Sequence, residues 1–128
     1  MKAGLLPGVS REVSFVVTEA MCPAFDSVVV HRVCATWTLV EYMEKAGRLV
    51  LVDFLEPHEE GVGSHVTCDH LAAASVGSTV RVVAITTGAT ERELVCAVDA
   101  YCGTKKIATG STVQKIFPRS MLKRLLGE

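Results

Sequence analysis

The sequence predicts an α+β fold in which one long helix packs on a single antiparallel sheet. Residues 34–55 carry apolar side chains at helical spacing, whereas the chain beyond Gly61 forms four strand-like stretches separated by short turns. A single apolar helix next to a run of strands must cover one face of the sheet that they form. Because the chain has 128 residues and no linker-like stretch, we expect one domain over residues 1–128.

The first half of the chain predicts one strand, one ambiguous segment and the helix. Residues 11–18 alternate well enough for a strand that ends before Cys22-Pro23, and residues 24–34 fit either a strand or a covering loop. The segment from Thr38 to Glu41 has the form of a capping box, so the helix is expected to begin at Thr38, with Thr36 as the competing N-cap.

The second half predicts four strands joined by turns. Their expected ranges are 61–71, 79–90, 93–102 and 107–117, followed by a helical turn or two at 120–126. The last two connections are short, which favours antiparallel hairpins.

Composition excludes several classes of partner. The net charge of −1 and the lack of a basic block predict no nucleic-acid partner and no anionic membrane surface. No stretch reaches the length of a membrane-spanning helix, and the apolar run near the N-terminus is too short for a signal peptide. Five cysteines, an odd number without a C-x-x-C pair, favour a reducing, cytoplasmic location. Neither they nor the histidines show ligand spacing, so we expect no metal site.

Two ionisable residues are candidates for chemistry. Glu44 is expected at the edge of the helix's apolar face, where a poorly solvated carboxylate is typical of catalytic sites; the alternative is a solvated side chain beside Lys45 or an ion pair with Arg48. His70 ends a predicted strand and faces away from Asp69, with small residues after it that leave room for a ligand. A hydrogen-bonded structural histidine is the alternative for His70.

Two further residues have weaker signals. Thr36 is either a helix cap or a hydroxyl placed near the carboxylate. Gly63 is either a bulge glycine or a point where backbone comes close to a substrate.

Taken together, these residues resemble the fluoroacetyl-CoA-specific thioesterase-like family of the hotdog thioesterase superfamily. The matching spans are residues 35–44 and 63–77. The family has a threonine, a glutamate eight positions later and a histidine 26 positions after that, a spacing that Thr36, Glu44 and His70 reproduce. Its glycines seven before and seven after the histidine correspond to Gly63 and Gly77.

The resemblance implies a fold, an activity and a site. The fold is the hotdog, an antiparallel sheet of five to six strands wrapped around a long central helix. The activity is hydrolysis of a short or modified acyl-CoA to free acid and CoA, with Thr36, Glu44 and His70 as catalytic residues and Gly63 and Ser64 as substrate-binding residues. No cofactor is implied, because CoA is part of the substrate. The implied assembly is a homodimer or a dimer of dimers with sites along the subunit interface, and the alternative function is a non-catalytic acyl-CoA-binding hotdog protein.

Two points qualify what the resemblance implies. A helical Thr36 lies about 12 Å along the axis from Glu44, at about 1.5 Å per residue. Either Thr36 precedes the helix and folds back, or it serves a site completed by a partner subunit. The positions that carry aromatic lid residues in the fluoroacetyl-specific member hold Ser27 and Val30, with only Phe25 nearby, so we do not predict fluoroacetate selectivity.

Overall fold

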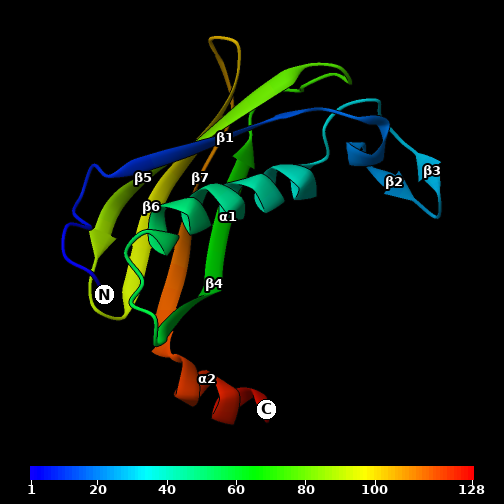
Figure 1. The fold of residues 1–128 in the computed structure, drawn as a ribbon. Coiled ribbons are helices and arrows are strands. Elements are labelled where there is room, and N and C mark those ends of the chain that lie inside the picture. The colour runs from blue at the N-terminus through cyan, green and yellow to red at the C-terminus, as the bar shows by residue number, and fades with distance from the viewer.

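The protein, described over residues 1–128 by a computed structural model, is built on a five-stranded antiparallel sheet (Figure 1). The strand order is β1-β5-β6-β7-β4, so β1 and β4 form its edges. The elements, in chain order, are β1 Ser10–Val16, the 3-10 turn η1 Glu19–Met21, β2 Ala24–Phe25, β3 Val28–Val29, α1 Thr36–Val52, β4 Glu59–His70, β5 Thr79–Ala89, β6 Glu93–Cys102, β7 Lys105–Pro118 and α2 Arg119–Leu126. The α+β class and the antiparallel order of the last four strands are as predicted.

Helix α1 lies across one face of the sheet (Figure 1) and supplies five of the twenty residues of the hydrophobic core. Its buried side chains recur every three or four residues, as a helix with one apolar face requires: Leu39, Met43, Ala46 and Val50. They pack against the inward-facing residues of β5, β6 and β7. A helix seated on one sheet face is the arrangement that the apolar pattern predicts.

The start of α1 differs from both sequence-based expectations. The helix begins at Thr36, and its N-cap is Ala35, which has no capping side chain, so neither the Thr38 box nor a Thr36 cap is present. Thr38 is buried on the core side of the helix, where its hydroxyl donates to the carbonyl of Met21 at 3.4 Å. Because Thr38 lies within the first turn and its hydroxyl faces the interior, it does not cap the helix.

The segment that the sequence left ambiguous forms a small separate hairpin. Strands β2 and β3 pair only with each other and project beyond the start of α1 (Figure 1). Asp26 and Ser27 make the turn with φ values of 51° and 66°. A two-residue turn with positive φ at both positions matches the twist of the flanking strands.

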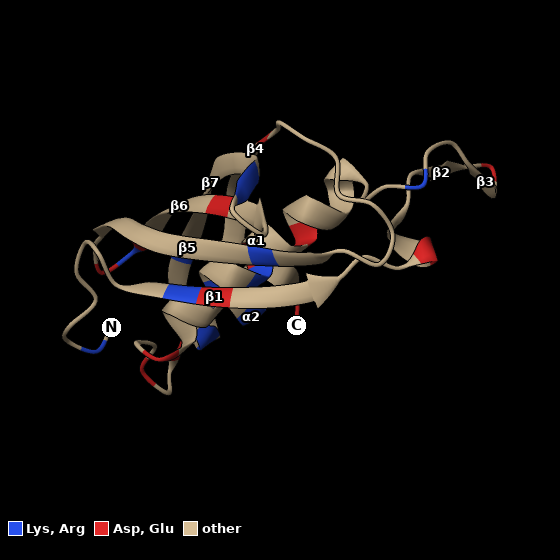
Figure 2. Cartoon of the chain, turned by 90° about the horizontal axis from the view of Figure 1, so that it is seen from above, with Lys and Arg blue, Asp and Glu red and all other residues tan.

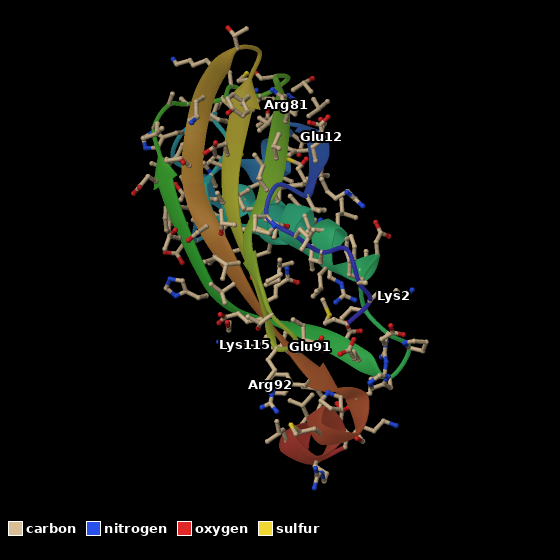
Figure 3. The ribbon with its side chains drawn as sticks, turned by 90° about the vertical axis from the view of Figure 1, so that its left-hand side faces the viewer. Lys2, Glu12, Arg81, Glu91, Arg92 and Lys115 are labelled. Carbon is tan, nitrogen blue, oxygen red and sulfur yellow. The ribbon has the colours of Figure 1, made fainter.

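Surface charge is mixed in sign. Lys and Arg alternate with Asp and Glu over the visible elements (Figure 2). Cross-strand pairs contribute to this mixture, such as Arg81 with Glu12 at 3.2 Å between β5 and β1 (Figure 3). Neither helix combines the length and apolar character needed to cross a membrane.

One glycine permits the close packing of β7, β4 and α1. A Cβ placed on Gly110 would lie 1.9 Å from the carbonyl oxygen of Thr67 and 2.9 Å from Cε of Met43. The first of these atoms belongs to the backbone of a paired strand and cannot move without breaking the β4–β7 ladder. Gly110 therefore sets how closely the edge strand approaches the core.

Replacing Gly110 with alanine is expected to lower the free energy of unfolding by about 2–4 kcal/mol, because the added methyl group overlaps the backbone of β4. Gly88→Ala is the matched control, since a Cβ there meets no atom within 4 Å. Urea unfolding followed by circular dichroism measures both. Equal midpoints for the two variants would show that β4 tolerates displacement.

Candidate functional site

The start of α1 meets the end of β4 at Thr36 and His70. Thr36 Oγ1 lies 2.9 Å from His70 Nδ1, and the direction of this hydrogen bond follows the imidazole tautomer. The other ring nitrogen, His70 Nε2, is buried and has no hydrogen-bond partner. The structure thus brings two of the three predicted catalytic residues together and leaves one imidazole nitrogen free.

Two backbone donors lie beside the threonine hydroxyl. The N–H groups of Thr36 and Trp37 make no hydrogen bond within the chain, and Ala35 supplies no capping side chain. The first N–H groups of a helix carry partial positive charge, which favours an anionic oxygen. This end of α1 therefore combines a hydroxyl, an imidazole and unpaired N–H groups.

An aromatic pair borders the same end of the helix. Phe25 of β2 packs edge-on against Trp37, with ring centroids 5.7 Å apart. Both rings remain largely exposed, at 60 % for Phe25 and 51 % for Trp37. The aromatic contact therefore joins the β2–β3 hairpin to the first turn of α1.

Glu44 lies two turns further along α1 and is exposed, so the expectation of a poorly solvated carboxylate at the apolar edge is wrong for a single chain. The alternative of a solvated carboxylate beside Glu41 and Lys45 agrees with the structure of the single chain, whereas the alternative ion pair with Arg48 is wrong, because both neighbouring cations have another acid. Lys45 pairs with Glu41 at 2.6 Å, and Arg48 pairs with Glu60 at 2.5 Å. Glu44 is left without a partner.

The Glu44 carboxylate instead approaches the backbone of β4. A Cβ placed on Gly63 would lie 3.2 Å from Oε1 of Glu44. The register of β4 against β7 shifts between Gly63 and His65, which marks a β-bulge. The expectation of a bulge glycine at Gly63 is therefore confirmed, and its lack of a side chain lets the Glu44 carboxylate come close. Ser64, within the bulge, donates its hydroxyl to the carbonyl of Val113 at 3.3 Å.

Glu44 opens into a cavity of about 350 Å³ between α1, β4 and β7. Gly63, His65 and Gln114 also line this cavity, which we call the Glu44 cavity, whereas Thr36 and His70 do not. Arg48 forms part of its wall. The hydrogen bond from Arg48 holds the pKa of Glu60 below its usual range, with help from the N–H of Gly61, so this ion pair persists at neutral pH.

Thr112 and Gln114 are cavity residues to which the sequence analysis gave no role. They occupy inward-facing positions of β7, between Gly110 and Ile116. Polar side chains at two successive inward positions of a strand were the signal for them, because inward positions are otherwise apolar or small.

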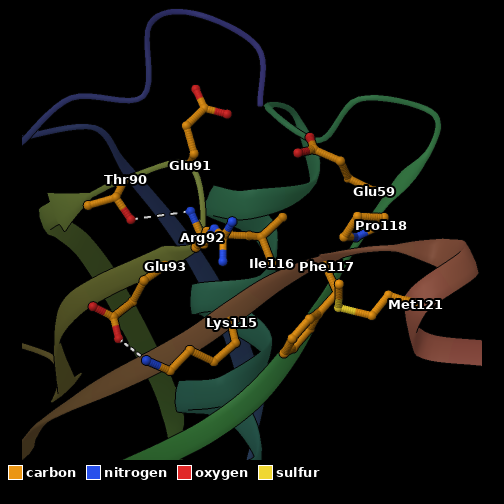
Figure 4. A pocket seen from close by; sticks show the side chains of 10 residues that line it. All are labelled: Glu59, Thr90, Glu91, Arg92, Glu93, Lys115, Ile116, Phe117, Pro118 and Met121. Carbon is orange, nitrogen blue, oxygen red and sulfur yellow. Dashed lines mark hydrogen bonds and ion pairs between the residues drawn. The ribbon is translucent and has the colours of Figure 1, made fainter. Parts of the chain in front are cut away.

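A larger cavity, of about 620 Å³, lies at the other end of the molecule and contains none of the predicted residues (Figure 4). It is bounded by the β5–β6 turn, the end of β7 and the start of α2. Two of its acids are paired: Glu93 with Lys115, which also lines the cavity, and Glu59 with the amino group of Met1, which does not, at 2.8 Å. Figure 3 shows Glu91, Arg92 and Lys115 at this end.

The cysteines near the candidate residues are protonated at neutral pH. Burial, with a smaller contribution from Cys22, raises the pKa of the Cys34 thiol to about 11. Burial also raises the pKa of Cys68, two residues before His70. Neither thiol supplies the thiolate that a nucleophilic cysteine requires.

Comparison with known proteins identifies the family. The family model described as fluoroacetyl-CoA-specific thioesterase (FlK) matches residues 17–120. A Thermus thermophilus protein of the thioesterase superfamily is 36 % identical with a TM-score of 0.92, over 97 % of this chain and 92 % of that one. A variant of the fluoroacetyl-CoA-specific thioesterase FlK, solved with fluoroacetate and CoA, is 25 % identical with a TM-score of 0.81, over 91 % and 98 %.

A hot-dog-like protein from Thermanaerovibrio acidaminovorans is 17 % identical with a TM-score of 0.85, over 94 % of this chain and 89 % of that one, and shares the fold. Among curated proteins, none matches the chain. Since the family model covers most of the chain and the fold agrees, the protein belongs to the fluoroacetyl-CoA-specific thioesterase family.

Proposed function

We propose that the protein is an acyl-CoA thioesterase that hydrolyses a short or modified acyl-CoA to the free acid and CoA. The observation that carries this is the hydrogen bond between Thr36 and His70 at the start of α1, in a chain of a thioesterase family. We assign Thr36, Glu44 and His70 as the catalytic residues and Gly63 and Ser64 as substrate-binding residues.

Each group suits one requirement of thioester hydrolysis. The backbone N–H groups of Thr36 and Trp37 can hold the carbonyl oxygen as it becomes negative. Glu44 either takes a proton from the attacking water or attacks the carbonyl itself, after which water cleaves the anhydride. In both routes the C–S bond breaks with its electron pair on sulfur, and His70 delivers a proton to the CoA thiolate.

The active unit that we propose is a homodimer formed through β4. This strand has one unpaired edge and exposes Val62 and His65 at its centre. Unpaired strand edges bind other strands, and a two-fold axis pairs two copies of one strand antiparallel.

Such a pairing of β4 strands explains how Thr36 and Glu44 can act on the same thioester. Within one chain they lie about 12 Å apart along the helix axis, and Thr36 is already helical, so it does not fold back towards Glu44. Antiparallel pairing of two β4 strands brings the Glu44 cavity of one subunit towards the Thr36–His70 pair of the other. Each dimer then holds two sites, and each site is completed by both subunits.

The proposed chemistry needs no cofactor, because CoA enters as part of the substrate. The five free cysteines support a cytoplasmic location.

Glu44→Gln is expected to lower kcat at least about a hundredfold on the best substrate of an acyl-CoA panel, because the amide cannot accept a proton or attack. Release of free thiol measures the rate. Glu12→Gln is the control, since Glu12 is an exposed carboxylate on β1 that pairs with Arg81. No turnover of any acyl-CoA by the wild type, with binding detected by calorimetry, would favour a non-catalytic acyl-CoA-binding protein.

Thr36→Val is expected to lower kcat about tenfold to a hundredfold, because the imidazole loses the hydroxyl that orients it. Thr36→Ser keeps the hydroxyl and should retain most of the rate. Steady-state kinetics on the same substrate compares the two. Equal rates for valine and serine would remove Thr36 from the site.

Subunit mixing tests the composite site. If Glu44→Gln and Thr36→Val subunits exchange freely, each mixed dimer contains one intact site, and an equimolar mixture should recover about a quarter of the wild-type rate. If all three residues act within one chain, mixing restores nothing. Sedimentation of each variant alone confirms that both form dimers.

A further inference from the structure

Gln114 lies at the floor of the Glu44 cavity and has an unmet hydrogen-bonding requirement. It is only 7 % exposed, and its Nε2 is buried without a partner. A buried amide donor without an acceptor destabilises a folded protein, so native structures satisfy such groups with protein or water. Something that accepts a hydrogen bond is therefore expected at this nitrogen.

The two ends of the Gln114 amide have different surroundings. A Cβ placed on Gly61 would lie 3.7 Å from Oε1 of Gln114 and 3.6 Å from Nη1 of Arg48, so both atoms border the space above Gly61. A Cβ placed on Gly47 would lie 3.3 Å from Nε2. The amide oxygen therefore lies on the side of Gly61, and Nε2 lies on the side of α1, near Gly47.

The Glu44 carboxylate occupies the facing wall. Glu44 and Gly47 are three residues apart and share one face of α1. Gly63, which Oε1 of Glu44 approaches, is paired directly with Gln114 across β4 and β7. An unpaired acceptor and an unpaired donor therefore line one cavity, and no hydrogen bond joins them.

We propose that Gln114 is the water-positioning residue of this thioesterase: its amide N–H and the Glu44 carboxylate together hold the water that hydrolyses the acyl group. This inference rests on the proposed function. The cavity of about 350 Å³ has room for a water molecule and for part of a substrate.

The geometry of water suits this pair of groups. The amide N–H donates to one lone pair of the water oxygen, and the carboxylate accepts one of its protons. The second lone pair is then free to form a bond to the carbonyl carbon. When this water attacks the carbonyl carbon, its proton passes to Glu44. The C–S bond breaks with its electron pair on sulfur, and His70 then protonates the sulfur to give CoA.

Gln114→Met tests the donor, because methionine is similar in size and has no N–H. We expect kcat to fall about a hundredfold while KM changes less than about threefold, with no loss of thermal stability. Thr86→Val is the matched control, since Thr86 is 2 % exposed, has an unpartnered hydroxyl and does not line the cavity. Its kcat should equal that of the wild type.

Gln114→Glu tests the role through the pH dependence of kcat, which should not change if Gln114 is only structural. A second carboxylate next to Glu44 raises the pKa of the pair, so the acid limb of the kcat profile should shift to higher pH. A crystal structure of the wild type should show a water between Nε2 of Gln114 and Glu44, and that of Gln114→Met should lack it.

Three results would overturn the inference. One is an unchanged kcat in Gln114→Met, and another is the absence of a water between Gln114 and Glu44 in the wild-type crystal. The third is a raised KM with altered acyl preference in Gln114→Met, which would make Gln114 an acyl-binding residue. Failure of the proposed function is distinguishable from these results. In that case the wild type hydrolyses no acyl-CoA, while the crystallographic water still shows whether Gln114 and Glu44 hold one.

Discussion

The close approach of α1 to β4 and β7 is the constraint on which the rest of the structure depends. Glycines face the helix where the elements are nearest, and Gly110 leaves no space for even one methyl group. This packing places Glu44 against Gly63 and Thr36 against His70. Any change in the distance between helix and sheet would alter both contacts at once.

The same packing explains why one chain holds Glu44 and the Thr36–His70 pair in two separate places. Eight residues of helix span about 12 Å, whereas the seven residues from Gly63 to His70 span about 23 Å of strand. The helix and the strand therefore separate the carboxylate from the imidazole along their length. A second copy of β4 running in the opposite direction is the simplest way to bring opposite ends together, and the free edge of β4 is available for it.

The fold was largely predictable from the sequence because its signals are local. Apolar spacing located α1, and alternation located the four long strands to within a few residues, although pairing between β4 and β7 extends both beyond the apolar pattern. The resemblance to the fluoroacetyl-CoA-specific thioesterase family and the thioester hydrolase class that it implies are confirmed. The helix start was wrong because capping-box residues are recognised by type, whereas the direction in which Thr38 points depends on tertiary packing.

The site was less predictable because it depends on contacts between distant residues. The sequence spacing selected Thr36 and His70, which are in contact, but it could not show that Glu41 and Glu60 pair with Lys45 and Arg48 and leave Glu44 free. Gln114 was given no role by the sequence analysis. Its position opposite Gly63 follows from the β4–β7 register, which no short-range pattern encodes.

The β2–β3 hairpin makes the surface beside the start of α1 more mobile than the rest of the domain. Its two short strands contribute nothing to the main sheet, and its apolar side chains are exposed. Segments with so few buried contacts open at much lower free energy than the core, without global unfolding. The hairpin can thus detach and reseat on its own timescale while the five-stranded sheet stays intact, so the aromatic surroundings of Trp37 change by local fluctuation and not by unfolding of the domain.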